Sequence, residues 1–180
     1  EFLQLDFEMS FCTQEDVQSI VEGSLIKILR ECSKKPIKGG AIPKYTWQEV
    51  MDRYGSEKPD LRYDLPIVDI SPIAHGCGFS IFEEALRSGG TVRALRVPGG
   101  TDLSRGEIDR WTEIVKEMKA KGLAYILLKR DGAQSPILKF LSDAAVEVMF
   151  LKDLGNALGS IGAVDGDLVF FGADTAKVVN

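Results

Sequence analysis

The sequence predicts an α+β fold in which helices cover one small sheet of about four strands. Short apolar stretches typical of strands alternate with helical segments, in the order β-α-β-α-β-α-β. Their connections are short and contain glycine, proline and aspartate, which favours sequential elements that pack beside one another. The expected strands are residues 66–70, 92–97, 123–128 and 168–171.

A junction at residues 54–62, with the sequence YGSEKPDLR, separates this pattern from a mostly helical N-terminal part. Gly55 is typical of the position just after a helix, and Pro59 prevents the helix from continuing. Proline also pushes the residue before it toward extended geometry. The sequence therefore predicts two parts, residues 1–63 and residues 64–180.

Local capping signals predict where the helices begin. Thr13 is a suitable N-cap because acidic residues follow it, and helical spacing continues to about Arg30. Thr46, Ser80 and Ser104 each open a capping box, with a glutamate three residues later. Further helix starts are expected at Pro136, Ser142 and Asp174.

Composition limits the classes of function. The formal net charge of -5 argues against a broad phosphate-binding surface, and no DNA partner is expected. No apolar run approaches the roughly 20 residues of a membrane span, so a soluble protein is expected. Cys12, Cys32 and Cys77 show neither paired nor metal-like spacing, which predicts no metal site and a reducing, cytoplasmic location.

Three groups of residues carry weaker functional signals. His75 and Cys77 lie in a glycine-rich loop, but a nucleophile and its base would also need an orienting group, so a loop role is the better interpretation. Arg93 and Arg96 fall on opposite faces of their strand and form no flat basic patch. The lysines of residues 32–43 suit a solvated connector better than an RNA contact.

Residues 1–11 have the period of a half-buried strand. Apolar side chains alternate with Gln4, Asp6 and Glu8, so one face is apolar and the other is polar. Taken alone, this pattern favours an amphipathic strand whose polar face meets water.

Three segments resemble bacterial-type aspartyl-tRNA synthetases, which are class II enzymes, and they occur in the order of that family. Residues 54–62 are similar to the place where the catalytic core passes into an inserted GAD domain. Residues 1–11, EFLQLDFEMSF, resemble the end of the motif 2 region, and residues 92–100, VRALRVPGG, resemble a signature strand of the insert. Because the three matches follow the order of the family over residues 1–100, the sequence is identified as an internal fragment of such a synthetase.

The resemblance implies that residues 1–63 are a fragment of the catalytic core and residues 64–180 the GAD domain, with its last helix truncated. It also implies a two-layer α/β sandwich with a largely antiparallel sheet. In this family the strand matching residues 1–11 lines the aminoacylation pocket, so Gln4 and Asp6 are expected to face the aspartate substrate. A carboxylate suits the substrate ammonium, and an amide can both donate and accept.

The activity implied by the resemblance is the ligation of aspartate to tRNA, in which ATP activates L-aspartate as an adenylate and the acyl group then passes to tRNA. The implied cofactors are ATP and Mg²⁺, and the implied assembly is a homodimer. The phosphate-binding arginines and magnesium-binding acids of the family match no residue of this chain. No catalytic residue is therefore assigned, and the chain alone is expected to bind no cofactor and to be inactive.

An alternative is a stand-alone interaction module, related to the GAD domain in a subunit of the tRNA-dependent amidotransferases. Residues 1–11 discriminate between the two hypotheses, because an independent module has no use for a strand of a class II pocket. This observation favours the ligase.

Overall fold

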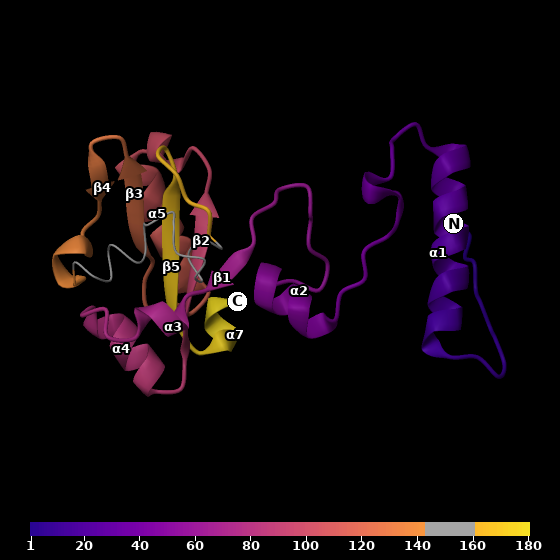
Figure 1. The fold of residues 1–180 in the computed structure, drawn as a ribbon, viewed down its shortest axis with the longest axis horizontal. Helices are drawn as coiled ribbons and strands as arrows, with labels where there is room; N and C mark the ends of the chain where they lie inside the picture. Colours follow the sequence, from indigo (N-terminus) through magenta and orange to yellow (C-terminus); the bar gives the residue numbers. More distant parts are fainter. Residues whose placement is uncertain (143–160) are drawn as a thin grey trace. The chain divides into compact units, whose positions relative to one another are not determined.

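The computed structural model describes residues 1–142 and 161–180 and contains two compact units (Figure 1). The first unit is Glu1–Tyr45 and the second is Thr46–Asn180. Each is described below by itself. The second unit begins upstream of the junction and includes the helix before it, so the boundary between residues 63 and 64 stays a prediction.

The N-terminal unit is built around one helix, α1, at Gln14–Cys32. Thr13 caps it as predicted: its hydroxyl accepts a hydrogen bond from the Asp16 N–H, and the Asp16 carboxylate accepts from the Thr13 N–H. A short 3₁₀ turn, η1, follows at Lys38–Gly40. No residue of α1 is buried, so the helix is defined by local signals rather than by packing.

The strand expected over residues 1–11 is wrong for this structure. These residues have no regular secondary structure, and every one of them is exposed. The physical reason is that a strand needs a partner for its N–H and C=O groups, and the unit Glu1–Tyr45 contains no other strand.

The second unit is organised on a five-stranded sheet in the order β1-β2-β5-β3-β4 (Figure 1). Its strands are β1 Ile67–Asp69, β2 Thr91–Val97, β3 Ala124–Lys129, β4 Gly132–Gln134 and β5 Leu168–Asp174. All neighbouring pairs are antiparallel. The predicted α+β class with a largely antiparallel sheet is therefore confirmed, and the four predicted strands are present. The fifth, β4, was not predicted because three residues beginning with glycine carry almost no strand signal.

Among the described residues, the helices of the second unit are α2 Trp47–Tyr54, α3 Ser71–Ala74, α4 Ser80–Arg87, α5 Arg105–Glu117 and α7 Ala176–Val179, with 3₁₀ turns η2 Gly100–Asp102 and η3 Leu138–Phe140. The capping boxes of Thr46 and Ser104 are confirmed. The one assigned to Ser80 is wrong, because Phe79 occupies the N-cap and makes no side-chain cap. Glu83 instead accepts a hydrogen bond from the Gly78 N–H at 3.3 Å.

Three predicted helix starts fall near the C-terminus. Pro136 precedes only the 3₁₀ turn η3 rather than a helix. The helical pattern expected from Ser142 falls on residues 143–160, which lie outside the described residues. Thr175, one residue after the predicted Asp174, is the N-cap of α7, and the Asp174 carboxylate accepts a hydrogen bond from its N–H at 2.7 Å.

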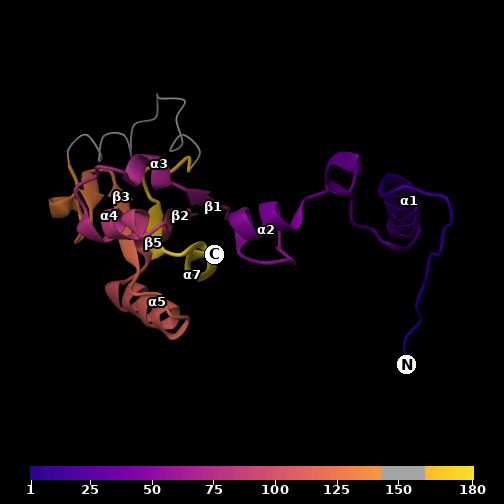
Figure 2. The same ribbon diagram turned by 90° about the horizontal axis from the view of Figure 1, so that it is seen from below.

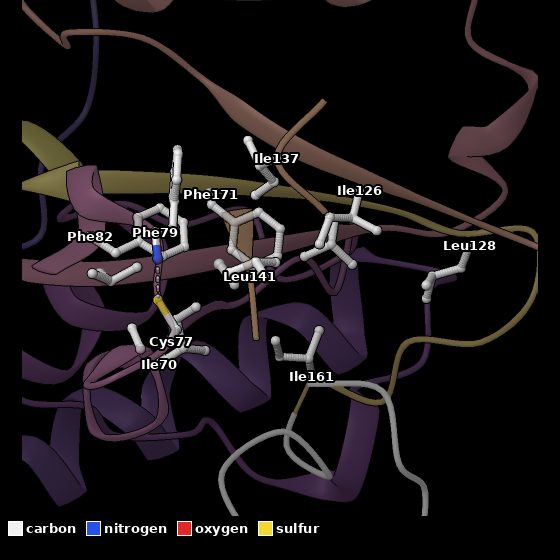
Figure 3. Close-up of a cluster of buried hydrophobic side chains, with 14 residues drawn as sticks. Ile70, Cys77, Phe79, Phe82, Ile126, Leu128, Ile137, Leu141, Ile161 and Phe171 are labelled. Carbon is white, nitrogen blue, oxygen red and sulfur yellow. Dashed lines mark hydrogen bonds between the residues drawn. The ribbon is translucent and has the colours of Figure 1, made fainter. Parts of the chain in front are cut away.

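The larger core lies on the face of the sheet that α3 and α4 cover. Phe82 of α4 packs edge-on against Phe79, with ring centroids 4.8 Å apart, and against Phe171 of β5 at 5.9 Å (Figure 3). The opposite face carries a smaller cluster in which Ile108 of α5 packs with Leu168 and Phe170. Figure 2 shows α5 on the other side of the sheet from α3.

Candidate functional sites

Gln4 and Asp6, the predicted aspartate-pocket pair, lie side by side on an extended segment. The Gln4 amide donates a hydrogen bond to Asp6 Oδ1 at 3.0 Å, and both side chains are exposed. Because the amide orients one carboxylate oxygen, the other can accept from an ammonium group. Their role in binding substrate stays a prediction.

The His75 and Cys77 loop is not arranged for nucleophilic catalysis. Cys77 is only 1% exposed and belongs to the larger core, where its Sγ accepts a hydrogen bond from the Phe79 N–H (Figure 3). Burial raises the pKa of the Cys77 thiol, which disfavours the reactive thiolate. His75 is exposed. The interpretation of these residues as parts of a structural loop is confirmed.

Arg93 of β2 forms a partly buried ion pair that sequence reasoning missed. Its side chain is 10% exposed and donates from Nη2 to Asp52 Oδ1 at 3.1 Å and from Nη1 to the Asp52 main-chain oxygen at 2.7 Å. Asp52, on α2, also accepts from Gln48 at 2.9 Å and from Asn180 at 3.5 Å. The Gln48 hydrogen bond is the main cause that lowers the pKa of Asp52, and Arg93 adds to it against the cost of burial.

Arg96 forms a second ion pair, with Asp167 at 2.6 Å. Asp167 is 3% exposed and also accepts from the N–H groups of Val164 at 2.9 Å and Gly99 at 3.1 Å. Burial alone would raise the pKa of Asp167, but the hydrogen bonds from Val164, Gly99 and Arg96 outweigh it and lower the pKa below its ordinary value. Through these contacts, Asp167 connects β2 with the loop that follows it and with the loop that precedes β5.

A largely apolar groove of about 630 Å³ lies on the sheet face that carries α5 and α7. Its walls come from β1, β2, β5 and both helices, with Trp111 and Met118 on the α5 side. The charged groups along it are Arg93, Lys121 and Asp174. Arg93 already pairs with Asp52 and Lys121 with Asp174, so the groove offers no cluster of free donors for a triphosphate.

Metal ligands and membrane spans were also sought among residues 1–142 and 161–180. In that part of the chain, no three His, Cys, Asp or Glu side chains are grouped to hold a metal ion. None of its helices is both long and apolar enough to span a bilayer. Cys12, Cys32 and Cys77 are all free thiols.

The fold and these sites define an α+β module whose sheet is fastened by two arginine–carboxylate pairs, with no nucleophile or metal centre recognised among the described residues. A family model described as the GAD domain matches residues 82–180, which is more than half of the chain. The chain belongs to the GAD domain family. The match includes Arg93, Arg96 and Asp167 but not Asp52 or the segment before it.

Similarity to curated proteins extends beyond the GAD match. The chain is 43% identical over 180 residues to an aspartate–tRNA(Asp/Asn) ligase of Desulfosudis oleivorans, covering all of this chain and 29% of that protein. It is 41% identical over 179 residues to an aspartate–tRNA ligase of Clostridium perfringens, and 40% identical over 181 residues to one of Lactiplantibacillus plantarum. These alignments cover 99% and 100% of this chain, and 28% and 29% of those proteins. The chain thus spans less than a third of the length of these relatives.

Proposed function

We propose that this chain is part of an aspartate–tRNA ligase, which activates L-aspartate with ATP and transfers it to tRNA. One observation carries the proposal: the similarity to ligases runs through all 180 residues, including the first 81, which the GAD model does not match. A stand-alone GAD module would be similar to these ligases only over residues 82–180, the part that the GAD model matches. The alternative of an independent interaction module is therefore disfavoured.

Within such a ligase, residues 1–63 would belong to the catalytic core and residues 64–180 would form the GAD domain. Asp6 would accept from the ammonium of L-aspartate, and Gln4 would orient the Asp6 carboxylate. The adjacency of the two side chains and their exposure support these roles. They are substrate-binding roles, because neither group takes part in bond formation.

ATP and Mg²⁺ do not fit the residues described here. The groove is largely apolar, and the described residues contain no group of three acids or histidines for a metal. In the proposed ligase, both would be held by residues outside this chain. The three free thiols support a reducing, cytoplasmic location, and the resemblance to the synthetase family supports a homodimer.

The test uses the full-length protein, purified beside the 180-residue chain. The full-length protein should exchange pyrophosphate into ATP only when L-aspartate is present, and should charge tRNA, whereas the chain alone should do neither. L-Glutamate, one methylene longer, serves as the control amino acid. A full-length protein without aspartate-dependent exchange would contradict the proposed function, and exchange by the chain alone would contradict the placement of the ATP site outside it.

A further inference from the structure

Asp52 joins three segments that are far apart in the sequence. It lies on α2, receives both Nη groups of Arg93 from β2, and receives the side-chain amide of Asn180 from the end of α7. The contacts to Arg93 bridge 41 positions of the chain, and the contact to Asn180 bridges 128. The segment that leads into the sheet and the segment that follows its last strand therefore meet at one carboxylate.

Gly55 shows how closely these two ends approach each other. It follows α2 in the left-handed conformation, with φ of 64°. A Cβ at this position would lie 1.9 Å from the main-chain oxygen of Asn180. A side chain at residue 55 would thus be strained by its backbone and would also collide with Asn180, the C-cap of α7, so glycine permits the contact.

Breaking the Arg93–Asp52 contact costs more for Arg93, in the sheet, than for Asp52, on α2. Arg93 is nine-tenths buried, and its Nε finds no hydrogen-bond partner among residues 1–142 and 161–180. The contacts of its Nη groups with Asp52 therefore compensate for burying the charge. The Asp52 side chain is 39% exposed and can turn to water. Removal of α2 would leave a buried cation without its carboxylate, whereas loss of Arg93 would leave Asp52 solvated.

We propose that the Arg93–Asp52 ion pair is a positioning clasp that holds α2 against the sheet and makes the two move as one body. Arg93 lies inside the region matched by the GAD family model, and Asp52 lies 30 residues upstream of its first residue, Phe82. The clasp thus fixes the orientation of the GAD domain with respect to the segment that precedes it. This inference does not depend on the proposed ligase activity.

The test is hydrogen–deuterium exchange of the 180-residue chain, followed by mass spectrometry of peptides from α2 and from β5. The variants are Asp52→Ala, Arg93→Met and their double variant. Arg53→Ala is the control on the same helix, because Arg53 is the exposed neighbour of Asp52 and alanine has a higher helix propensity than either residue, by more for aspartate than for arginine. Since alanine favours helix, faster exchange in Asp52→Ala must come from the lost hydrogen bonds of the Asp52 carboxylate. Arg93→Met separates the Arg93 contact from those of Gln48 and Asn180, which it leaves in place.

Exchange of the α2 amides should accelerate about tenfold or more in Asp52→Ala and in Arg93→Met, as expected for losing hydrogen bonds to a charged group. The double variant should be slower than the sum of the single effects predicts, because each single variant already breaks the ion pair between Arg93 and the Asp52 carboxylate. Peptides from β5 should stay protected in Asp52→Ala. Exchange in Asp52→Ala equal to that in Arg53→Ala, or additive effects in the double variant, would overturn the clasp. If Arg93→Met also exposes β5, Asp52→Ala and its control decide the question alone.

Discussion

The two compact units of this chain are stabilised in different ways. In the described part of Thr46–Asn180, five strands, two hydrophobic clusters and two arginine–carboxylate pairs connect residues that are distant in the sequence. In Glu1–Tyr45, α1 has a complete capping box but no buried residue, and Ile20, Leu25 and Ile28 are each more than 40% exposed. Most of the stability of a protein helix comes from packing of its apolar face, and no residue of α1 is buried.

The difference shows that local signals suffice to set where a helix begins but not to stabilise it. Thr13 and Ser104 make equivalent capping boxes, yet only the helix that begins after Ser104 buries a residue against the sheet. We therefore expect substitutions in the sheet unit to change a cooperative unfolding transition, and substitutions in α1 to change local helix content.

The largest expected effect comes from the core of the sheet unit. Phe82→Ala removes a ring that is 1% exposed and packs against two other phenylalanines, so the free energy of unfolding should fall by about 3–5 kcal/mol. Leu25→Ala in α1 removes a side chain that is 45% exposed, and should change the free energy of unfolding by less than about 0.5 kcal/mol. Urea unfolding followed by tryptophan fluorescence measures this, because Trp47 and Trp111 both lie in the sheet unit. Equal effects of the two substitutions would contradict the contrast between the units.

The next effect concerns function in the N-terminal unit. In a full-length protein, Asp6→Ala should raise the KM for aspartate far more than that for ATP, because it would remove the charge-assisted pair proposed between Asp6 and the substrate ammonium. Losses of this kind cost on the order of 2–5 kcal/mol. Glu8→Ala is the control, since Glu8 is also exposed and polar but makes no contact with Gln4. Unchanged aspartate dependence in Asp6→Ala would mean that this segment only faces water.

A smaller effect should follow acidification of the sheet unit. The pKa of Asp167 is lowered in the folded protein, so the stability it provides is present above the unfolded carboxyl pKa of about 3.9 and is lost as pH falls through the lower, folded value. Asp167→Asn should cost about 1–3 kcal/mol at pH 7 and should weaken the loss of stability in acid. Urea unfolding measured between neutral pH and pH 3 tests this. Asp165→Asn, an exposed change in the same loop, should keep the stability and the acid response of the unmodified chain.

The parts of the fold that could be predicted are those encoded by neighbouring residues. The caps at Thr13, Thr46 and Ser104 depend on side chains three positions apart, and the four predicted strands have clear apolar runs. The failures have a different origin. Ser80 was wrongly assigned as a cap because the chain turns into α4 one residue earlier, and β4 is defined by its pairing with β3 rather than by its own composition.

The ion pairs could not be predicted for the same reason. Period-2 alternation correctly separated Arg93 from Arg96, because side-chain direction along a strand is a local property. Their partners, Asp52 and Asp167, are 41 and 71 residues away, and only the folded sheet brings them into contact. The alternating pattern of residues 1–11 predicted a strand with Gln4 and Asp6 on one face. The strand does not form in this structure, because an alternating pattern does not supply a partner strand.

The smallest expected effect compares the two equivalent caps. Replacing an N-cap serine or threonine by alanine costs about 0.5–2 kcal/mol of helix stability. Ser104→Ala should therefore lower the stability of the sheet unit by about 1 kcal/mol in the fluorescence-detected transition, because α5 contributes Ile108 to its smaller core. Thr13→Ala should leave that transition unchanged and reduce the helix signal in far-ultraviolet circular dichroism instead.

Ser19→Ala is a suitable control for Thr13→Ala, because Ser19 lies inside α1, is exposed, and its hydroxyl donates a hydrogen bond to the main-chain oxygen of Glu15 in the same helix. Alanine at this position should preserve or increase the helix signal, since alanine is the better helix former. A fall in the fluorescence-detected stability of Thr13→Ala as large as that of Ser104→Ala would mean that α1 unfolds together with the sheet. In that case the two units would unfold cooperatively, and the contrast between a helix set by local signals and a sheet set by packing would be wrong.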